Sequence, residues 1–134
     1  MTYYVSTTID GPYEAAVTAV REALAQEGFG VITEIDIAKT MLAKLGVVFR
    51  PYVILGACNP ALAHEALMLE DKVGTMLPCN VIVQEAGEGR FEVAAIDPVA
   101  SMAAIDNPAL KVAAAAVAEK LRDALARLPA SSIR

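Results

Sequence analysis

The chain has 134 residues, a length that fits one compact domain and leaves little room for a second. Eleven Lys and Arg residues against sixteen Asp and Glu residues give a formal net charge of −5, which disfavours nucleic acid and anionic membrane surfaces as partners. Hydrophobic residues make up 56% of the chain and charged residues 20%, which excludes a disordered chain. We therefore predict a single folded domain over residues 1–134.

The cysteine content and the start of the chain bear on where the protein resides. Two cysteines, Cys58 and Cys79, are far too few for a disulfide-stapled secreted scaffold, so a reducing compartment is expected. The opening MTYYVSTTID lacks the basic and apolar regions of a secretory signal. The longest apolar runs, such as Val112–Ala118, are shorter than the roughly 18 residues of a membrane span. These features predict a soluble cytoplasmic protein.

The N-terminal part of the chain alternates strand and helix patterns. Thr2–Thr8 is rich in Tyr, Val and Thr, which is typical of a strand. Apolar residues then recur at helical spacing from Tyr13 onward, and Gly28 is a suitable end for this helix. Gly30–Ile37 alternates apolar and polar residues and predicts a second, half-buried strand, and Ala38–Leu45 predicts a short helix after it.

A continuous apolar run, Tyr52–Cys58, predicts a central strand of the sheet. Asn59-Pro60 follows directly and reads as a helix N-cap with proline in the first turn, so a helix is expected to about Glu70.

The last third of the chain predicts a hairpin and a long helix. Val81–Gln84 and Phe91–Ile96 read as two strands, joined by a longer loop over Glu85–Gly89. Asn107 caps a helix whose apolar positions step by three or four, and its Ala113–Ala116 stretch indicates close packing. The predicted class is α+β: an antiparallel sheet with helices on one face, in β-α-β4-α order, with short inserted helices and a long C-terminal helix.

Several segments carry a family resemblance: GFGVITEID, KLGVVFRPYVILGACNP, MLPCNVIVQE and AAIDP, with two Cys-Asn dipeptides in this order and separation. The sequence resembles the domain of unknown function 302 family over nearly its whole length. The resemblance implies a TATA-binding-protein-like β-α-β4-α arrangement, often seen as a dimer, in a family whose biochemical role is undefined. Such folds can hold a ligand between the sheet and the long helix, although a fold alone does not define a function.

The two cysteines are the first candidates for a site. Cys58 ends a strand just before a helix, where the helix dipole can stabilise a thiolate, and Cys79 begins the next strand. If these strands are antiparallel, both thiols lie at the same end of the sheet. With His64, one turn into the intervening helix, they would form a three-ligand set for zinc, copper(I) or haem iron. The alternative is that both are small buried side chains and that His64 lies on the surface.

Four further residues flank these strands. Asn59 is explained as an N-cap, whereas Asn80 begins a strand and has no cap to explain it. Arg50 and Tyr52 precede the central strand, where Arg50 can meet an anionic ligand and Tyr52 can close a pocket. An ion pair of Arg50 with Glu34 or Asp36 explains the arginine equally well.

Three functions fit these observations. The first is a dimeric binding domain whose site comprises Cys58, Asn59, Cys79, Asn80, Arg50 and Tyr52 and whose ligand is a metal, haem or small hydrophobic molecule. The second is a Cys-dependent redox or sulfur-transfer enzyme with His64 as a base and the asparagines orienting the substrate. The third is a structural dimerisation module that needs no pocket. No motif specifies a reaction, which favours binding over catalysis.

Overall fold

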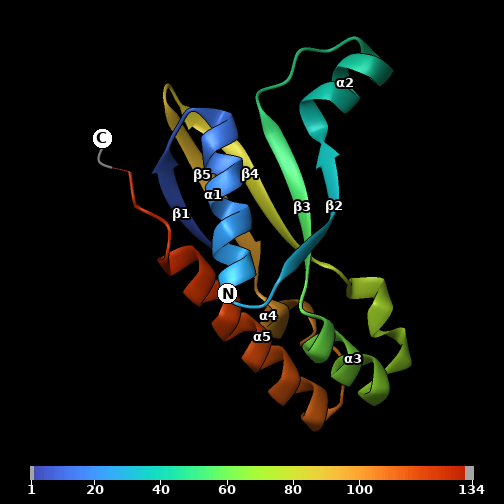
Figure 1. The fold of residues 1–134 in the computed structure, drawn as a ribbon. Helices are drawn as coiled ribbons and strands as arrows, with labels where there is room; N and C mark the ends of the chain where they lie inside the picture. Colours follow the sequence, from blue (N-terminus) through green and yellow to red (C-terminus); the bar gives the residue numbers. More distant parts are fainter. Residues whose placement is uncertain (1, 132–134) are drawn as a thin grey trace.

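The structure, a computed structural model, describes residues 2–131. It is a five-stranded sheet with helices packed on one face and at one end, and with a further helix projecting from the other end (Figure 1). The elements in chain order are β1 (Tyr4–Asp10), α1 (Tyr13–Gln26), β2 (Gly30–Asp36), α2 (Ile37–Leu45), β3 (Tyr52–Cys58), α3 (Pro60–Leu69), the 3-10 helix η1 (Asp71–Met76), β4 (Cys79–Gly87), β5 (Arg90–Ile96), α4 (Pro98–Ser101) and α5 (Pro108–Ala126). None of the helices in the described range is long and apolar enough to cross a bilayer.

The strands lie in the order β1-β5-β4-β3-β2, and each neighbouring pair is antiparallel. The α+β class, the β-α-β4-α order and the long C-terminal helix predicted from the sequence are therefore confirmed. The sheet has β1 and β2 as its two edges: after β1 the chain crosses by α1 to the opposite edge, and β3, β4 and β5 then fill the sheet back toward β1.

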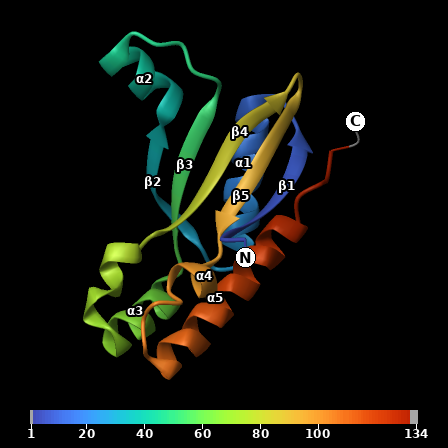
Figure 2. The same cartoon turned by 180° about the vertical axis from the view of Figure 1, so that it is seen from behind.

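One face of the sheet carries the core and the other faces away from the helices. Along β3, Val53, Leu55 and Ala57 are buried and point toward α1 and α5. The matching positions of the neighbouring strands, such as Val81 and Val93, are also fully buried, as the two-residue period of a strand requires. No helix lies over the opposite face in the view from behind (Figure 2), and we call this the open face; Ile54, Ile82 and Ala94 form one row across it.

Side-chain caps set several helix boundaries, and the cap of the last helix is the one that the sequence indicated. Asp36 accepts a hydrogen bond from the Lys39 backbone N–H at 2.9 Å and begins α2. Asn107 does the same for α5, accepting from the Leu110 N–H at 3.1 Å. The first strand begins and ends two residues later than predicted, and η1 and α4 were not anticipated because each is only about one or two turns long.

The β4–β5 hairpin is tighter than the predicted loop over Glu85–Gly89. The ladder continues to the pair Gly87↔Arg90, with an irregularity between Glu85 and Gly87, so only two residues connect the strands. Gly87 has φ +144°, a conformation that residues with a Cβ rarely adopt. This conformation accommodates the one extra residue of β4 at the irregularity, so that the two strands continue to pair beyond it.

A second, smaller hydrophobic cluster lies where α3, η1 and α4 meet the N-terminal half of α5, at the lower end of the sheet in Figure 1. Its buried members are Ala66, Val73, Met102, Leu110 and Ala114. At the other end of the sheet, α2 projects beyond the strands and has no buried residue. The two ends of the sheet therefore differ: one is closed by packed helices and the other carries an exposed helix.

Candidate ligand-binding cavity

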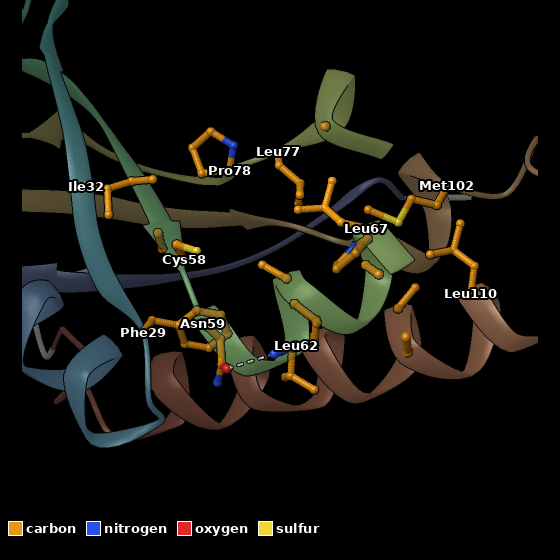
Figure 3. A pocket seen from close by; sticks show the side chains of 18 residues that line it. Phe29, Ile32, Cys58, Asn59, Leu62, Leu67, Leu77, Pro78, Met102 and Leu110 are labelled. Carbon is orange, nitrogen blue, oxygen red and sulfur yellow. Dashed lines mark hydrogen bonds between the residues drawn. The ribbon is translucent and has the colours of Figure 1, made fainter. Parts of the chain in front are cut away.

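A cavity of about 330 Å³ lies between the end of β3, helix α3 and the N-terminal half of α5 (Figure 3). Its walls are almost entirely apolar, and none of the described residues that line it is charged. The lining residues are Phe29, Ile32, Ala57, Cys58, Asn59, Leu62, Ala63, Ala66, Leu67, Gly74, Leu77, Pro78, Pro98, Met102, Leu110, Ala113, Ala114 and Val117.

The space exists because the facing surfaces of two helices carry small side chains. Ala63 and Ala66 of α3 and Ala113 and Ala114 of α5 line the same cavity. Both α5 alanines are buried, as the sequence indicated, but there they border an open space where close packing was expected. Larger residues, Leu62 and Val117 among them, close the cavity around this alanine-lined part.

The two cysteines lie at the same end of the sheet but in different surroundings. Ala57 and Cys79 are register partners in the antiparallel β3–β4 pair, so Cys58 is offset from Cys79 by one residue. Cys58 is half-buried and lines the cavity, whereas Cys79 is buried in the main core. Both thiols are free. Burial, with a smaller contribution from nearby Cys58, raises the pKa of Cys79 to about 11, so its thiol stays protonated at neutral pH.

The Asn59 side chain is committed to the start of α3. Its Oδ1 accepts a hydrogen bond from the Leu62 N–H at 3.2 Å, which is the N-cap interaction expected from the sequence (dashed in Figure 3). Its Nδ2 lies beside Gly28, since a Cβ built on that glycine would be 3.0 Å from the nitrogen. Asn59 therefore forms part of the wall mainly by holding the first turn of α3 in place.

Asn80 and Tyr52 lie elsewhere, on the open face. They line a shallow trough of about 390 Å³, the open-face trough, together with Tyr3, Tyr4, Ile82, Gln84, Glu92, Ala94, Ala95 and Ile96. Tyr52 and Cys58 occupy opposite ends of β3, roughly 20 Å apart at about 3.3 Å per residue. The six predicted site residues are thus divided between the cavity, the core and the open face.

Arg50 interacts with the open face. Its Nε donates to Gln84 Oε1 at 3.0 Å, and its guanidinium lies 4.6 Å from the Phe49 ring centroid and 5.6 Å from that of Tyr52. The alternative ion pair with Glu34 or Asp36 is not found among the ion pairs of residues 2–131: Glu34 pairs with Arg21 at 2.8 Å, and Asp36 caps α2. Packing against aromatic rings and the hydrogen bond to Gln84 account for the position of Arg50.

The predicted three-ligand set of Cys58, Cys79 and His64 is not assembled. Residues 2–131 contain no group of three or more His, Cys, Asp or Glu side chains placed to hold a metal ion. The reason lies in the helix period: α3 faces the cavity with positions 62, 63, 66 and 67, which turns the exposed His64 away from it.

Sequence reasoning identified Cys58 and Asn59 but missed the rest of the cavity wall. The lining alanines of α3 are three residues apart, and the lining positions of α5, at 110, 113, 114 and 117, step by three or four, spacings that place each set on one helix face. This signal was present in the sequence, but a face of alanines indicates close packing just as readily as an empty space, and only the distance between the two helices distinguishes them.

Comparisons with known proteins agree with this architecture. The family model described as "Domain of unknown function DUF302" matches residues 5–128. A solved structure, described as the crystal structure of an uncharacterized conserved DUF302 protein from Bacillus stearothermophilus, is 28% identical in sequence with a TM-score of 0.88. The similarity covers 96% of this chain and 100% of that one. Comparison with curated proteins gave no match. The chain therefore belongs to the DUF302 family.

Proposed function

We propose that this protein is a small binding domain that takes up a small hydrophobic molecule in the cavity at the end of β3. The observation that carries the proposal is a cavity of about 330 Å³ lined by apolar side chains. Its size falls within the range of natural ligand pockets, roughly 300–1,000 Å³, and such pockets are lined mainly by hydrophobic residues. Burial of apolar ligand surface supplies the binding free energy.

The donor atoms around the cavity favour a hydrophobic molecule over a metal or haem. The only thiol in the lining is Cys58, and the lining contains neither histidine nor carboxylate. A metal ion needs three or four such donors, and a haem iron needs an axial ligand within a much larger pocket. A Cys-dependent enzyme has less support, because His64 is exposed and does not line the cavity that Cys58 borders. The two free thiols fit a function in the cytoplasm.

The binding proposal is tested by native mass spectrometry and by titration with a neutral apolar dye, N-phenyl-1-naphthylamine. We expect dye fluorescence to rise on binding to the wild type and to be largely lost in Ala63→Leu, which fills the cavity from α3. Ala61→Leu is the matched control, because residue 61 is exposed on the same helix and does not line the cavity. Equal dye binding by both variants would contradict the proposal.

A separate observation supports a homodimer. Helix α2 and the segment after it expose large apolar side chains that no other part of residues 2–131 covers: Leu42 is 58% exposed, Leu45 69% and Val48 90%. Ile35 and Val47, on either side of α2, are about half exposed. A projecting apolar element of this kind is stabilised when a second copy covers it, and two-fold dimers are the commonest soluble oligomers.

Sedimentation velocity tests the dimer. The wild type is expected to sediment as a dimer, and the double substitution Leu45→Asp with Val48→Asp as a folded monomer, because charged side chains oppose burial of this patch. Val112→Asp serves as the control, since Val112 is 72% exposed on α5, far from α2. A wild type that remains monomeric at high concentration would remove the dimer proposal and leave the binding proposal untouched.

A further inference from the structure

The open-face trough is a second concave site, separate from the cavity at the end of β3. It has a volume of about 390 Å³ and shares no lining residue with that cavity. Three of its side chains form one row across neighbouring strands, because Tyr52 is the register partner of Gln84, and Gln84 that of Glu92. The next row along this face is apolar and includes Ile82 and Ala94. The trough therefore combines a polar row with a hydrocarbon surface.

Glu92 is the one charged side chain among the described residues that line the trough. It is half-buried, and its Oε1 accepts a hydrogen bond from Gln84 Nε2 at 2.8 Å. No other hydrogen bond and no ion pair of Glu92 is found within residues 2–131. A carboxylate that is partly removed from water and bonded only to a neutral amide remains a strong acceptor for a cationic donor.

Arg50 does not pair with this carboxylate. Its Nε donates to Oε1 of Gln84 at 3.0 Å, so the amide of Gln84 links the guanidinium to Glu92 without direct contact between the two charges. The guanidinium also lies over the rings of Phe49 and Tyr52. Because the amide oxygen accepts from Arg50, the amide nitrogen is the atom that is turned toward Glu92. The arginine thus fixes the orientation of Gln84 and leaves the charge of Glu92 without an ion-pair partner.

We propose that the open-face trough binds a small organic ammonium ion, with the ammonium group on Oε2 of Glu92 and the hydrocarbon part against Ile82 and Ala94. Charge complementarity supports a cation, because the only charge in the described lining is negative and the whole chain has a formal net charge of −5. The volume lies within the range of small-molecule pockets, roughly 300–1,000 Å³. This site is additional to the hydrophobic cavity and does not depend on it.

Three ligands of similar size but different charge test the proposal on the full-length protein: phenethylamine, phenethyl alcohol and hydrocinnamate. Backbone amide shifts in heteronuclear NMR spectra follow each titration and locate the bound ligand. The amine is expected to bind in the trough about tenfold more tightly than the alcohol, because a hydrogen bond between two charged groups replaces one to a neutral hydroxyl. Hydrocinnamate is not expected to bind there, since its carboxylate and that of Glu92 repel each other. The amides expected to shift with the amine are those of Ile82, Gln84, Glu92 and Ala94.

Glu92→Gln removes the charge but keeps the side-chain size and an oxygen that can accept from Gln84. Its affinity for phenethylamine should fall about tenfold, to that of the alcohol. Glu88→Gln is the matched control, because it changes the net charge equally, is exposed between β4 and β5 and does not line the trough. Circular dichroism establishes that both variants fold. The comparison of amine with alcohol in the wild type decides the question on its own if Glu92→Gln does not fold.

A preference for the amine that is lost in Glu92→Gln and kept in Glu88→Gln supports the ammonium site. Equal binding of amine and alcohol in the trough, an unchanged affinity in Glu92→Gln, or no amine-induced shift at the trough residues would overturn it. A Glu92→Gln variant that sediments as a monomer where the wild type is a dimer would also overturn it, because the trough would then be a contact between subunits. The hydrophobic cavity is tested separately by the dye, so these outcomes leave that proposal unaffected.

Discussion

Asn107 Nδ2 donates a hydrogen bond to the backbone carbonyl oxygen of Leu69 at 3.0 Å, joining residues 38 positions apart in the chain. The Oδ1 of the same side chain accepts the Leu110 N–H at 3.1 Å. One amide therefore caps the start of α5 and ties it to the last residue of α3. These two helices form two walls of the cavity, so this asparagine fixes how far apart those walls begin.

Replacing Asn107 should cost more stability than removing an ordinary cap. Asn107→Ala loses both bonds and is expected to lower the free energy of unfolding by about 2 kcal/mol. Asn59→Ala, which loses only a cap, should cost about 1 kcal/mol. Asn107→Asp keeps the acceptor and removes the donor, and should fall between them. Urea unfolding followed by circular dichroism gives the three values; equal losses for Asn107→Ala and Asn59→Ala would show that the bond to Leu69 contributes nothing.

Stability should fall at alkaline pH because of Cys79. Its pKa rises from an ordinary 9.0 to about 11 in the fold, so between these values the unfolded chain has released a proton that the folded chain still holds. This stabilising contribution is complete below pH 9 and is lost as pH rises toward 11, a change of about 2–3 kcal/mol. Urea unfolding at pH 8, 9, 10 and 11 measures it.

Cys79→Ala is the control for this pH dependence. It should flatten the decline but leave part of it, because burial and the carboxylates of Asp36 and Glu34 also raise the pKa of Tyr13. Cys58→Ala should leave most of the slope, since burial is the larger cause of the shift at Cys79. An unchanged slope in Cys79→Ala would contradict the assignment.

Gly56 has no room for a side chain. A Cβ built there would collide with the Thr33 hydroxyl and lie 2.8 Å from Cγ of Pro78. Gly56→Ala should therefore destabilise the protein by about 1–3 kcal/mol, because the proline ring cannot easily move aside. Gly30→Ala, in the adjacent strand, has no atom within 4 Å of its added Cβ and should change stability little. Thermal melts of the two variants compare the sites, and similar melting temperatures would count against the steric argument.

Arg127 joins the ends of α1 and α5. Its Nη2 lies 2.6 Å from Glu27 Oε2, and its Nη1 donates to Gln26 Oε1 at 2.6 Å. The Glu27 side chain is only 11% exposed, so Arg127→Ala should cost about 1–2 kcal/mol by leaving that carboxylate without its partner. Lys72→Ala breaks the exposed pair with Asp71, whose side chains are 80% and 81% accessible, and should cost less than about 0.5 kcal/mol. Chemical unfolding of both variants tests the contrast, and equal costs would contradict it.

The fold was largely predictable because its boundaries depend on local chemistry. Three helices are capped by a side chain that accepts a hydrogen bond from the backbone N–H three residues later, an interaction that depends only on neighbouring residues: Asn59, Asn107 and Asp36. The hairpin was mispredicted because its length depends on how Gly87 adjusts to the partner strand, which only the pairing of β4 with β5 determines.

The site was less predictable because it depends on distances between elements. Sequence proximity grouped Arg50 and Tyr52 with Cys58, yet they lie at opposite ends of one strand. Because successive side chains of β4 point to opposite faces of the sheet, Cys79 lies in the core and Asn80 lies on the open face. The cavity itself arises from how closely α3 approaches α5, and no local pattern encodes that separation.

The edges of the sheet bear on aggregation. A five-stranded open sheet leaves the outer sides of β1 and β2 available for pairing with strands of other molecules. Here β2 is interrupted by an irregularity between Val31 and Thr33 and carries the charged Glu34, while the backbone N–H of Ser131 donates to the Thr8 carbonyl at 2.6 Å and occupies part of the β1 edge. Each edge therefore carries a feature by which natural sheets disfavour the addition of strands from other molecules: an irregularity and a charge on β2, and a covering segment on part of β1.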